Sequence, residues 1–507
     1  MSRYKILDVN SLAKLAHEFR QSGKKVVLCH GTFDLMHTGH IRYLQRAHKE
    51  GDVLMVTVTA DEHVNKGPGR PVFGDQLRVE NIAALECVHY VAVNHSATAV
   101  DLLEKIRPSL YVKGSEYRDH AGDVTGNIMR EIEVVERHGG AIFYTDEITF
   151  SSSGLLNEHF GVFSQETKKF LEEFGSQYSY KKIHAQIDSL ANIKVLVVGD
   201  AIIDQYHYVS PLGQTGKGNV LAVQYQSEEQ FAGGSLAVAN HISQFVKTVD
   251  LLTCLGSSDS HEDFIRDRLK KNVKPIFTYF KDAPTVTKRR FVDADLAKFF
   301  EVYFFQESPE LEDDGKESLD WLDKYLPEYD LVIVADFGNG FVSKDMVQVL
   351  CEKASYLAVN TQINSGNRGF HVINRYTRAD FVSLNEPELR LAAHNRHDLL
   401  ETVCQDVAIK LGTKGFAVTR GTKGVIFFDS EKQSFHKVPA LSSRVIDRIG
   451  AGDAFLSLAS LCMAGGLDSH VANFVGCVAA AMEVQIVCNR EPIDPVNLKK
   501  YVSTLLK

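Results

Sequence analysis

Short runs of β-branched residues alternate with amphipathic helical patterns in two separate blocks of this 507-residue sequence. The first block extends from Val26 to about Leu156, and the second begins at Lys194. Such alternation is typical of parallel sheets covered by helices. A chain of this length also exceeds what one hydrophobic core usually organises. The sequence therefore predicts two α/β domains, each with a parallel sheet.

The expected strands of the first block are Val26–His30, Val53–Thr59, Tyr90–Val93, Leu110–Val112 and Ile142–Thr145. Those of the second block are Val195–Val198, Leu331–Ala335, Tyr356–Asn360, Phe381–Leu384 and Phe416–Thr419. The segment between the blocks is polar and helix-prone and carries no strand pattern. We expect one domain over residues 1–157, a helical connector over 158–193 and a second domain over 194–507.

Acidic and basic residues are spread along the chain, and the formal net charge is -9 at pH 7. Because no basic stripe is present, the sequence indicates small-molecule substrates rather than nucleic acid. The eight cysteines are scattered without a CxxC pair, which predicts reduced thiols in a cytoplasmic protein and no cysteine-ligated metal.

Two apolar patterns bear on export and membranes. The first 25 residues alternate apolar and charged side chains, so they lack the apolar core of a secretory signal. The late apolar stretch from Ala454 to Val487 is interrupted by Gly465, Asp468 and His470. It predicts two buried helices and no membrane association.

The first expected strand leads into the turn 31–40, GTFDLMHTGH, and a helical pattern follows. Backbone N–H groups in such a turn can face an anion, and the helix N-terminus adds partial positive charge. His37 and His40 can both donate hydrogen bonds to phosphate oxygens, and Gly39 leaves room for a close approach. The alternative is that the histidines only cap or pack the helix and that Asp34 caps the turn.

This segment resembles the cytidylyltransferase-like nucleotidyltransferases, whose signature is a strand, then GxFDxxHxGH, then a helix. The resemblance covers residues 25–157 and is closest to the adenylyltransferase half of bifunctional enzymes that make ADP-heptose. It rests further on these segments, which fall in the expected order: Arg70-Pro71-Val72, Gln76-Leu77-Arg78, Ala84-Leu85-Glu86, Lys113-Gly114 and Ser151-Ser152-Ser153.

The resemblance implies a Rossmann-like domain in which His37, His40 and Lys113 are catalytic and contact phosphates. The nucleotide-binding residues that it implies are Gly31, Thr32, Phe33, Asp34, Gly39, Lys66, Arg78, Ser151, Ser152 and Ser153. Attack of a sugar phosphate oxygen on an α-phosphorus needs no protein nucleophile. Positioning, Mg²⁺ and positive donors would therefore supply most of the catalysis.

The strongest local pattern in the second block is DRIGAGDAF, residues 447–455, which stands between a β-like run and a long apolar helix. Gly450, Ala451 and Gly452 can expose backbone N–H groups at the helix start, which predicts an anion hole for a transferred phosphoryl group. Asp453 can then accept the proton of a hydroxyl that attacks the γ-phosphate. The alternative is a tight glycine turn with an Asp N-cap.

This motif resembles the DTTGAGDxF signature of ribokinase-like (PfkB) sugar kinases, and the resemblance covers residues 194–490. It implies a ribokinase-like α/β domain with Asp453 as the base. The sugar-binding residues that it implies are Asp204, Gly233, Gly234, Asn240, Lys288 and Arg290. Those implied for the nucleotide and its Mg²⁺ are Asn385, Glu388, Thr419, Gly421 and Gly424, together with the anion hole. Asp200 and Asp336 could equally cap loops.

Several features depart from the family patterns. Ala237 stands where a substrate-binding Asn is expected, and Arg448 and Ile449 replace two threonines. The strand that usually ends in Asp-Pro-Lys ends here in Asn-Thr-Gln, residues 360–362. The domain order is also the reverse of the usual heptose enzyme, which has its kinase first. These departures leave the exact sugar open.

The sequence thus leads to one main hypothesis and two rivals. The main hypothesis is a homo-oligomeric, bifunctional enzyme that uses Mg²⁺, NTP and sugar phosphates to make an activated sugar of the ADP-heptose type. The first rival keeps both reactions but uses CTP and a polyol or another sugar phosphate. The second makes the kinase half a degenerate binding module, against which the intact Gly450–Asp453 run argues.

Overall fold

The computed structural model describes residues 3–64, 67, 69–118, 127–145, 163–367 and 369–506. The chain divides into two compact units. The small unit comprises residues 1–164 and 499–507, and the large unit comprises residues 165–498. Each has its own sheet and core, and each is described by itself.

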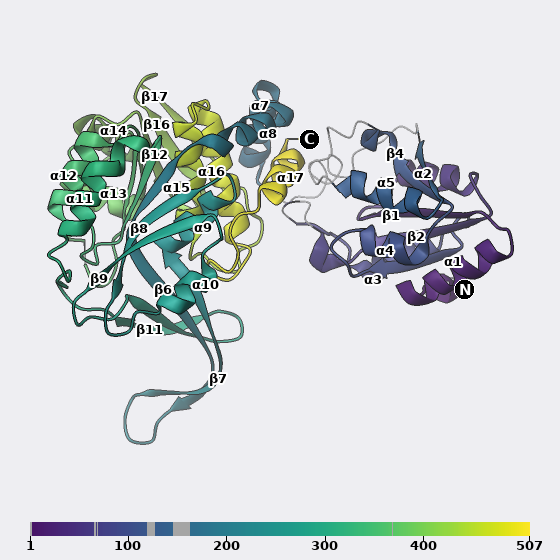
Figure 1. Cartoon of the computed structure of the whole chain (residues 1–507), viewed down its shortest axis with the longest axis horizontal. Helices are drawn as coiled ribbons and strands as arrows, with labels where there is room; N and C mark the ends of the chain where they lie inside the picture. The colour runs from purple at the N-terminus through teal and green to yellow at the C-terminus, as the bar shows by residue number, and fades with distance from the viewer. Residues whose placement is uncertain are drawn as a thin grey trace. The chain divides into compact units, whose positions relative to one another are not determined.

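The small unit contains a five-stranded parallel sheet with the order β3-β2-β1-β4-β5 (Figure 1). The strands are β1 (Val26–Gly31), β2 (Val53–Thr59), β3 (Tyr90–Asn94), β4 (Leu110–Gly114) and β5 (Ala141–Thr145). All five lie where the sequence predicts them. The direction of strand succession reverses between β1 and β4, and ligands of such sheets bind beyond the carboxyl ends of the strands at this point.

Helices cover both faces of this sheet because side chains alternate along each strand. The helices are α1 (Val9–Gln21), α2 (Thr38–His48), α3 (Asp75–Ala83), α4 (Val100–Ile106) and α5 (Asn127–Arg137). Val27 and Cys29 of β1 belong to the core cluster that includes α2 and α3. Val26 and Leu28 belong to the cluster that includes α1, α4 and α5. Both faces of β1 are therefore buried, as its continuous apolar sequence requires.

The large unit is built on a central sheet with the order β9-β8-β6-β12-β13-β14-β15-β16-β17. Its strands are β6 (Val195–Gln214), β8 (Val249–Gly256), β9 (Val273–Phe280), β12 (Leu331–Asp336), β13 (Leu357–Thr361), β14 (Phe381–Asn385), β15 (Gly415–Thr419), β16 (Val425–Asp429) and β17 (Ser434–Val438). The strands from β9 to β15 in this order are parallel, and the last two are antiparallel. Succession reverses at β6, so a ligand site is expected beyond the carboxyl end of β6.

Strand β6 continues out of the central sheet into a second sheet with the order β7-β6-β10-β11. The added strands are β7 (Leu221–Gly234), β10 (Thr287–Val292) and β11 (Lys298–Phe304). The far ends of β6 and β7 project from the body of the unit as a long hairpin (Figure 1). We call this second sheet the lid sheet. The added strands β7, β10 and β11 were not among those expected from the sequence, because charged and polar residues interrupt their apolar pattern.

The helices of the large unit are α7 (Gln165–Gln177), α8 (Tyr180–Ser189), α9 (Ser235–Ser243), α10 (Glu262–Arg268), α11 (Lys316–Tyr325), α12 (Lys344–Lys353), α13 (Glu386–Ala392), α14 (Leu400–Leu411), α15 (Ala451–Ala464) and α16 (Ser469–Glu483). The division between the units, at residues 498 and 499, falls within α17 (Pro495–Leu505). Helices α15 and α16 are almost wholly buried. No helix in the described ranges is long and apolar enough to cross a membrane.

The segment expected as a connector holds α7 and α8, and α7 packs on the large unit. The rings of Phe174 and Phe474 stack with centroids 4.3 Å apart. Phe174 also meets the edge of His470, and Tyr178 donates a hydrogen bond to Asp468 Oδ1 at 3.0 Å. These contacts make α7 part of the core of the large unit.

We expect Phe174→Ala to lower the free energy of unfolding of the large unit by about 3–5 kcal/mol, because a buried ring leaves a cavity. The chain's single tryptophan, Trp321, lies in the large unit, so its fluorescence during urea unfolding reports on this unit. Leu399→Ala is the control, since that side chain is 76% exposed and its loss should cost under about 0.5 kcal/mol. Equal midpoints for the two variants would contradict the packing role of α7.

Two candidate active sites

The first candidate site lies where β1 leads into α2. His37 caps α2, and its Nδ1 accepts a hydrogen bond from Gly39 N at 3.0 Å. The neutral His37 ring therefore carries its hydrogen on Nε2, and burial lowers the pKa of His37, which favours this neutral form. His40 Nδ1 lies 3.1 Å from Leu35 O, to which it donates. The two rings stack with centroids 4.0 Å apart, so both imidazoles are fixed side by side at the mouth of the helix.

Lys113 reaches the same edge of the sheet from the carboxyl end of β4. Cys29 pairs with Val112 across β1 and β4, so the next residues, His30 and Lys113, end neighbouring strands. Burial and the charge of Lys113 together lower the pKa of His30 to about 3. The HxGH turn and Lys113 therefore meet at the point where strand succession reverses.

Lys113 is held by a partner that the sequence did not reveal. Its Nζ lies 2.7 Å from Glu131 Oε2 on α5, and Tyr111 donates to the same oxygen at 3.1 Å. An ammonium group has three donors, so this ion pair leaves the lysine able to bind a phosphate. Glu131 belongs to an ordinary helical pattern later in the chain than Lys113. Only the tertiary fold places its side chain beside β4.

Arg78, for which the sequence predicts nucleotide binding, makes its hydrogen bonds within the protein. This side chain is fully buried, and its guanidinium donates to three backbone carbonyls, Thr32 O at 2.7 Å, Phe73 O at 2.8 Å and Thr59 O at 2.8 Å. It also pairs with Asp61. Arg78 thus braces the turn after β1 from behind, because its donors point into the protein.

Asp34 also shapes this turn. Its Oδ1 accepts hydrogen bonds from Val72 N at 2.7 Å and Phe73 N at 3.1 Å, which fits the turn-capping alternative. Phe33 adopts a positive φ of 48° at the sharpest point of the turn. Gly31 is the last residue of β1, Thr32 begins the turn, and Gly39 lies in the first turn of α2. The expected nucleotide-binding residues Lys66, Ser151, Ser152 and Ser153 lie outside the described residues.

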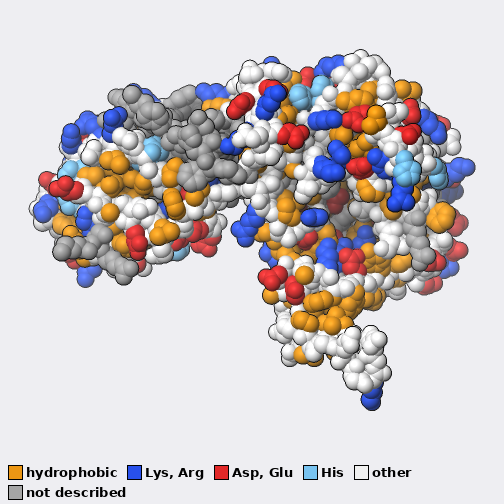
Figure 2. Space-filling view, turned by 180° about the vertical axis from the view of Figure 1, so that it is seen from behind, with side chains coloured by type: hydrophobic (Ala, Val, Ile, Leu, Met, Phe, Trp, Pro, Cys, Tyr) orange, Lys and Arg blue, Asp and Glu red, His pale blue; other side chains and the backbone are white. Residues whose placement is uncertain are grey.

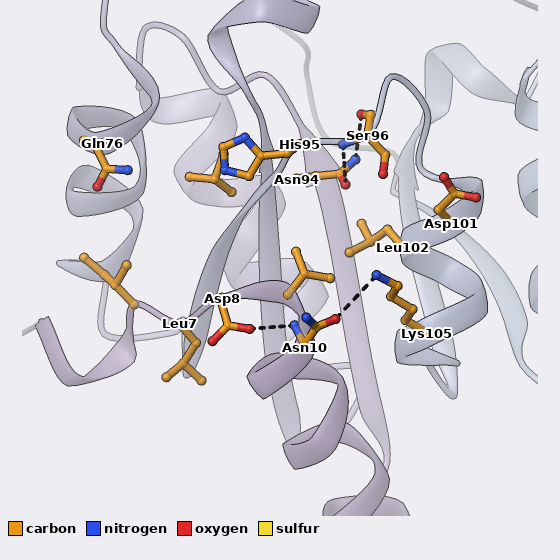
Figure 3. Close-up of a pocket in the computed structure, with 13 residues that line it drawn as sticks. Leu7, Asp8, Asn10, Gln76, Asn94, His95, Ser96, Asp101, Leu102 and Lys105 are labelled. Atoms are coloured by element: carbon orange, nitrogen blue, oxygen red, sulfur yellow. Dashed lines mark hydrogen bonds between the residues drawn. The ribbon is translucent and has the colours of Figure 1, made fainter.

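A separate cavity of about 410 Å³ in the small unit lies at the β3 edge of the sheet, between the starts of α1 and α4 (Figure 3). None of the predicted transferase residues lines it. Asp8 Oδ1 accepts from Asn10 N at 2.9 Å, and Lys105 Nζ donates to Asn10 Oδ1 at 3.4 Å (Figure 3). Because its polar groups bond to one another, this cavity is not the candidate transferase site.

The second candidate site surrounds the start of α15 in the large unit. Gly450 caps this helix with a positive φ of 88°, which favours glycine. Burial raises the pKa of Asp453 to about 7, with further contributions from Asp204 and Glu388, while Lys288 acts in the opposite direction. A carboxylate with this pKa is suited to accept a proton near neutral pH.

Asp204 lies where β6 enters the lid sheet, and its charge is met from the neighbouring strand. In register, Lys288 of β10 stands beside Asp204, and Arg290 NH1 bonds to Asp204 Oδ1. Arg290 Nε also lies 3.1 Å from Glu301 Oε1 of β11, a partner missed in the sequence. Lys288 is buried, and burial lowers its pKa. The four charged groups form a compact cluster at the root of the lid sheet.

The position of these charged groups explains why two residues of β7 are glycines. A Cβ at Gly233 would overlap Asp204 Oδ2, and Gly234 adopts a φ of 60° with its backbone against Asp200 O. Both residues are therefore needed for the shape of the site, whatever their contact with a sugar.

The residues expected to bind the nucleotide come together at the ends of β14 and β15. Asn385 pairs with Thr419 across these strands. Asn385 Oδ1 accepts from Glu388 N at 2.9 Å, and Glu388 Oε2 accepts from Asn385 N at 2.7 Å, which is a capping box at α13. Burial raises the pKa of Glu388 to about 7. Gly421 and Gly424 shape the turn into β16 with φ values of 57° and 76°.

Asn240, for which the sequence predicts sugar binding, makes hydrogen bonds to the backbone. Its amide donates to Arg268 O at 3.1 Å and accepts from Lys270 N at 3.0 Å, so it fastens the connection between α10 and β9. Asp200 and Asp336 are likewise engaged in loop contacts, Asp200 with Phe337 N and Asp336 with Arg375.

Asp447 organises the loop before α15. It accepts hydrogen bonds from Arg448 N at 2.7 Å, Cys488 N at 3.2 Å and the Tyr206 hydroxyl. The same residue thus ties the anion-hole loop to β6, and the sequence motif contained it without indicating this role.

Residues 192–493 match the family model described as pfkB family carbohydrate kinase, which covers more than half of the sequence. The chain belongs to the pfkB family of carbohydrate kinases. Residues 28–156 match the model described as cytidylyltransferase-like. The predictions of an enzyme with these two domains, in this order, and of α/β folds for both are confirmed.

Curated relatives match the small unit. The bifunctional protein HldE of Geobacter sulfurreducens is 37% identical over 140 residues, which are 27% of this chain and 27% of that protein. HldE of Citrifermentans bemidjiense is 38% identical over 143 residues, or 28% of each chain. The match thus spans about a quarter of the length of these relatives.

Solved structures align with the other part of the chain. Arabidopsis thaliana ribokinase complexed with ribose and ATP aligns with 62% of this chain and 99% of its own, with 19% identity and a TM-score of 0.46. Escherichia coli phosphofructokinase-2 in complex with substrates and products aligns with 61% and 99%, with 14% identity and a TM-score of 0.49.

We expect Arg78→Met to destabilise the small unit by at least about 2 kcal/mol, because it leaves buried carbonyl groups without donors. In far-UV circular dichroism, only the unfolding transition of the small unit should move to lower stability. The transition followed by Trp321 fluorescence, which reports on the large unit, should not change. The control is Arg137→Met, since its pairs with Glu104 and Glu133 lie at the surface and each should contribute under about 1 kcal/mol. A nucleotide-contacting Arg78 would instead give normal stability with weakened NTP binding.

The raised pKa of Asp453 predicts a pH-dependent effect of Asp453→Asn on stability. Since the folded-state pKa of about 7 lies above the usual aspartate pKa of 3.8, the folded protein is progressively destabilised as pH rises from about 4 to 7. The neutral amide removes this effect. The increase in Tm that Asp453→Asn gives the large unit should therefore be larger at pH 8 than at pH 5. An equal increase at both pH values would contradict the raised pKa of Asp453.

Proposed function

We propose that the large unit phosphorylates a sugar phosphate with ATP, and that the small unit transfers a nucleotidyl group from an NTP to a sugar 1-phosphate with release of pyrophosphate. The observation that carries the proposal is the position of both motifs: each phosphate-binding helix start lies at the carboxyl edge of its parallel sheet, beside charged groups from neighbouring strands. We further propose a heptose 7-phosphate type of acceptor and an ADP-heptose-like product, which the match to HldE supports.

In the kinase reaction, Asp453 accepts the proton of the attacking sugar hydroxyl while the backbone N–H groups of Gly450–Gly452 bind the transferred phosphoryl group. Asp204 orients sugar hydroxyls, and Gly233 and Gly234 bring the backbone close to them. Lys288 and Arg290 supply positive charge on the sugar side, which suits an acceptor that already carries a phosphate.

Mg²⁺ would enter with the nucleotide. In the described part of the chain, no group of three or more His, Cys, Asp or Glu residues could hold a metal ion. Mg²⁺ usually keeps several waters and is held by one or two carboxylates plus substrate phosphates. The buried Glu388, with Asn385 beside it and Thr419, Gly421 and Gly424 lining the nucleotide, is the carboxylate that fits this arrangement. The ion would neutralise phosphate charge.

In the transferase reaction, His37 donates a hydrogen bond from Nε2 to the α-phosphate, His40 does so from Nε2 as the imidazolium, and Lys113 binds a phosphate group of the nucleotide or the sugar. Gly31, Thr32, Phe33, Asp34 and Gly39 form the turn that approaches the nucleotide, and Lys66, Ser151, Ser152 and Ser153 complete its binding. No protein nucleophile is required, because the sugar phosphate oxygen attacks directly. We propose ATP as the donor. Faster release of pyrophosphate from CTP would favour the cytidylyl alternative.

We also propose that the protein forms a homo-oligomer in the cytoplasm. The lid sheet ends in two edge strands and exposes Leu221, Tyr225, Phe300, Val302 and Phe304. Figure 2 shows hydrophobic side chains gathered near the root of the projecting hairpin. An exposed sheet edge with apolar side chains is usually covered by another element or another chain. None of the eight cysteines forms a disulfide, which is typical of a reducing compartment.

We expect single substitutions to uncouple the two activities. Asp453→Asn should lower kinase turnover by about 10²–10⁴-fold, since it removes a positioned base, and leave pyrophosphate release unchanged. His37→Ala or His40→Ala should lower pyrophosphate release by roughly 10²–10³-fold and leave sugar phosphorylation unchanged. Both rates are measured on each purified variant.

Thermal unfolding of each variant controls for global damage. A folded Asp453→Asn protein with normal kinase turnover would remove the base assignment, whereas a folded parent protein without kinase turnover would favour a binding module. Loss of both activities in one folded variant would indicate a shared site instead.

A further inference from the structure

The loop that follows β13 lies where the sequence departs from the Asp-Pro-Lys ending usual in the family. We call residues 362–367 the asparagine loop. Asn364 Oδ1 accepts hydrogen bonds from Gly366 N at 2.8 Å and Asn367 N at 2.9 Å, which braces the loop internally. The side-chain amides of Asn364 and Asn367 donate to Phe337 O at 2.8 Å and 3.2 Å. The loop is therefore fixed to the residue that follows β12.

The asparagine loop also contacts β11 of the lid sheet and the residue after it. Burial raises the pKa of Tyr303, whereas a hydrogen bond from the Ser365 side chain lowers it, as expected where the Tyr303 oxygen accepts. A Cβ added at Gly366 would lie 3.2 Å from Phe305 Cζ. The Tyr303 hydroxyl donates to Glu301 Oε2 at 2.6 Å. Tyr303 thus both accepts from the loop and donates within the lid sheet.

The ammonium group of Lys288 lies near two aromatic rings that the asparagine loop holds. Lys288 and Tyr303 are cross-strand neighbours in β10 and β11. Lys288 Nζ lies 5.8 Å from the ring centroid of Tyr303 and 5.5 Å from that of Phe337. The side chain is only 8% exposed, and its charge acts on both Asp204 and Asp453. Attraction to the two rings offsets part of the cost of burying this cation.

Tyr303 is also connected to Asp204 through two other charged side chains. Glu301 accepts from the Tyr303 hydroxyl through Oε2 and from Arg290 Nε at 3.1 Å through Oε1. Arg290 in turn pairs with Asp204. Arg290 and Glu301 are cross-strand neighbours two residues along from Lys288 and Tyr303, so all four side chains project from the same face of the lid sheet.

We propose that Tyr303 is a positioning residue of the kinase and that the asparagine loop anchors it. Ser365 fixes its ring beside Lys288. Its hydroxyl fixes Glu301, and Glu301 in turn fixes Arg290. The inference rests on the proposed sugar kinase function and deepens it, because Lys288 and Arg290 are the cations assigned to the acceptor. Displacement of Tyr303 should therefore weaken binding of the acceptor and spare binding of the nucleotide.

The test measures binding of heptose 7-phosphate to the full chain by calorimetry without ATP, and separately binding of a non-hydrolysable ATP analogue with Mg²⁺. Tyr303→Phe keeps the ring and removes the hydroxyl, so it should weaken sugar phosphate binding about tenfold. Tyr303→Leu also removes the ring and should weaken it about a hundredfold. Both variants should bind the ATP analogue as the parent does.

Ser365→Ala tests the anchor, and it should weaken sugar phosphate binding at least about threefold. The double variant Tyr303→Phe, Ser365→Ala should bind no more weakly than Tyr303→Phe alone, because both substitutions remove the same hydrogen bond. Tyr225→Phe is the matched control, since it removes the hydroxyl of a tyrosine in the same lid sheet that is 56% exposed. It should bind both ligands as the parent does.

Trp321 fluorescence checks that each variant is folded. Parent-like sugar phosphate binding by both folded Tyr303 variants would overturn the positioning role, and so would an equal loss of affinity for the sugar phosphate and the ATP analogue. A parent protein that binds the sugar phosphate, with the expected losses in the variants, but never phosphorylates it would overturn the kinase function and leave the positioning role standing.

Discussion

Strand β6 belongs to both sheets of the large unit, and this continuity decides where the charges of the kinase site can lie. Its first residues are buried in the central sheet, and its later residues pair with β7 and β10 in the lid sheet. Asp204 stands at the transition. A carboxylate buried there requires a partner, and Arg290 from the neighbouring strand supplies it. The lid sheet thus supplies the positive charge that stabilises the acidic group at its root.

The small unit also buries charged groups at its sheet, and these groups likewise require partners. Lys113 ends β4 beside β1, and Glu131 from α5 holds its ammonium group. Arg78 is buried behind the turn that carries the histidines, and backbone carbonyls satisfy its donors. In each unit a glycine-containing turn leads into a helix at the carboxyl edge of the parallel sheet, and buried charge pairs fix the surrounding strands. The two sites are built independently, since each uses only residues of its own unit.

The strands of the small unit and the parallel strands β6 and β12–β15 could be predicted because both of their faces are buried, which leaves short apolar runs in the sequence. Strands β7, β10 and β11 could not, because one face of the lid sheet carries the site's charges and its outer part is exposed. The motifs led to His37, His40 and Asp453 as candidates. They did not reveal Glu131 or Glu301, because each reaches its site only through tertiary packing.

The central claim is that two separate phosphate-transfer reactions occur in one chain. A kinase acting on carbon 1 of heptose 7-phosphate gives a bisphosphate, whereas the transferase requires a 1-phosphate, so a phosphatase must act between them. The most direct measurement is phosphorus NMR of the purified protein with ATP and Mg²⁺, supplied first with heptose 7-phosphate and then with heptose 1-phosphate. We expect the bisphosphate alone in the first mixture, and pyrophosphate with nucleotide-heptose in the second. Nucleotide-heptose in the first mixture, or no pyrophosphate in the second, would contradict this account.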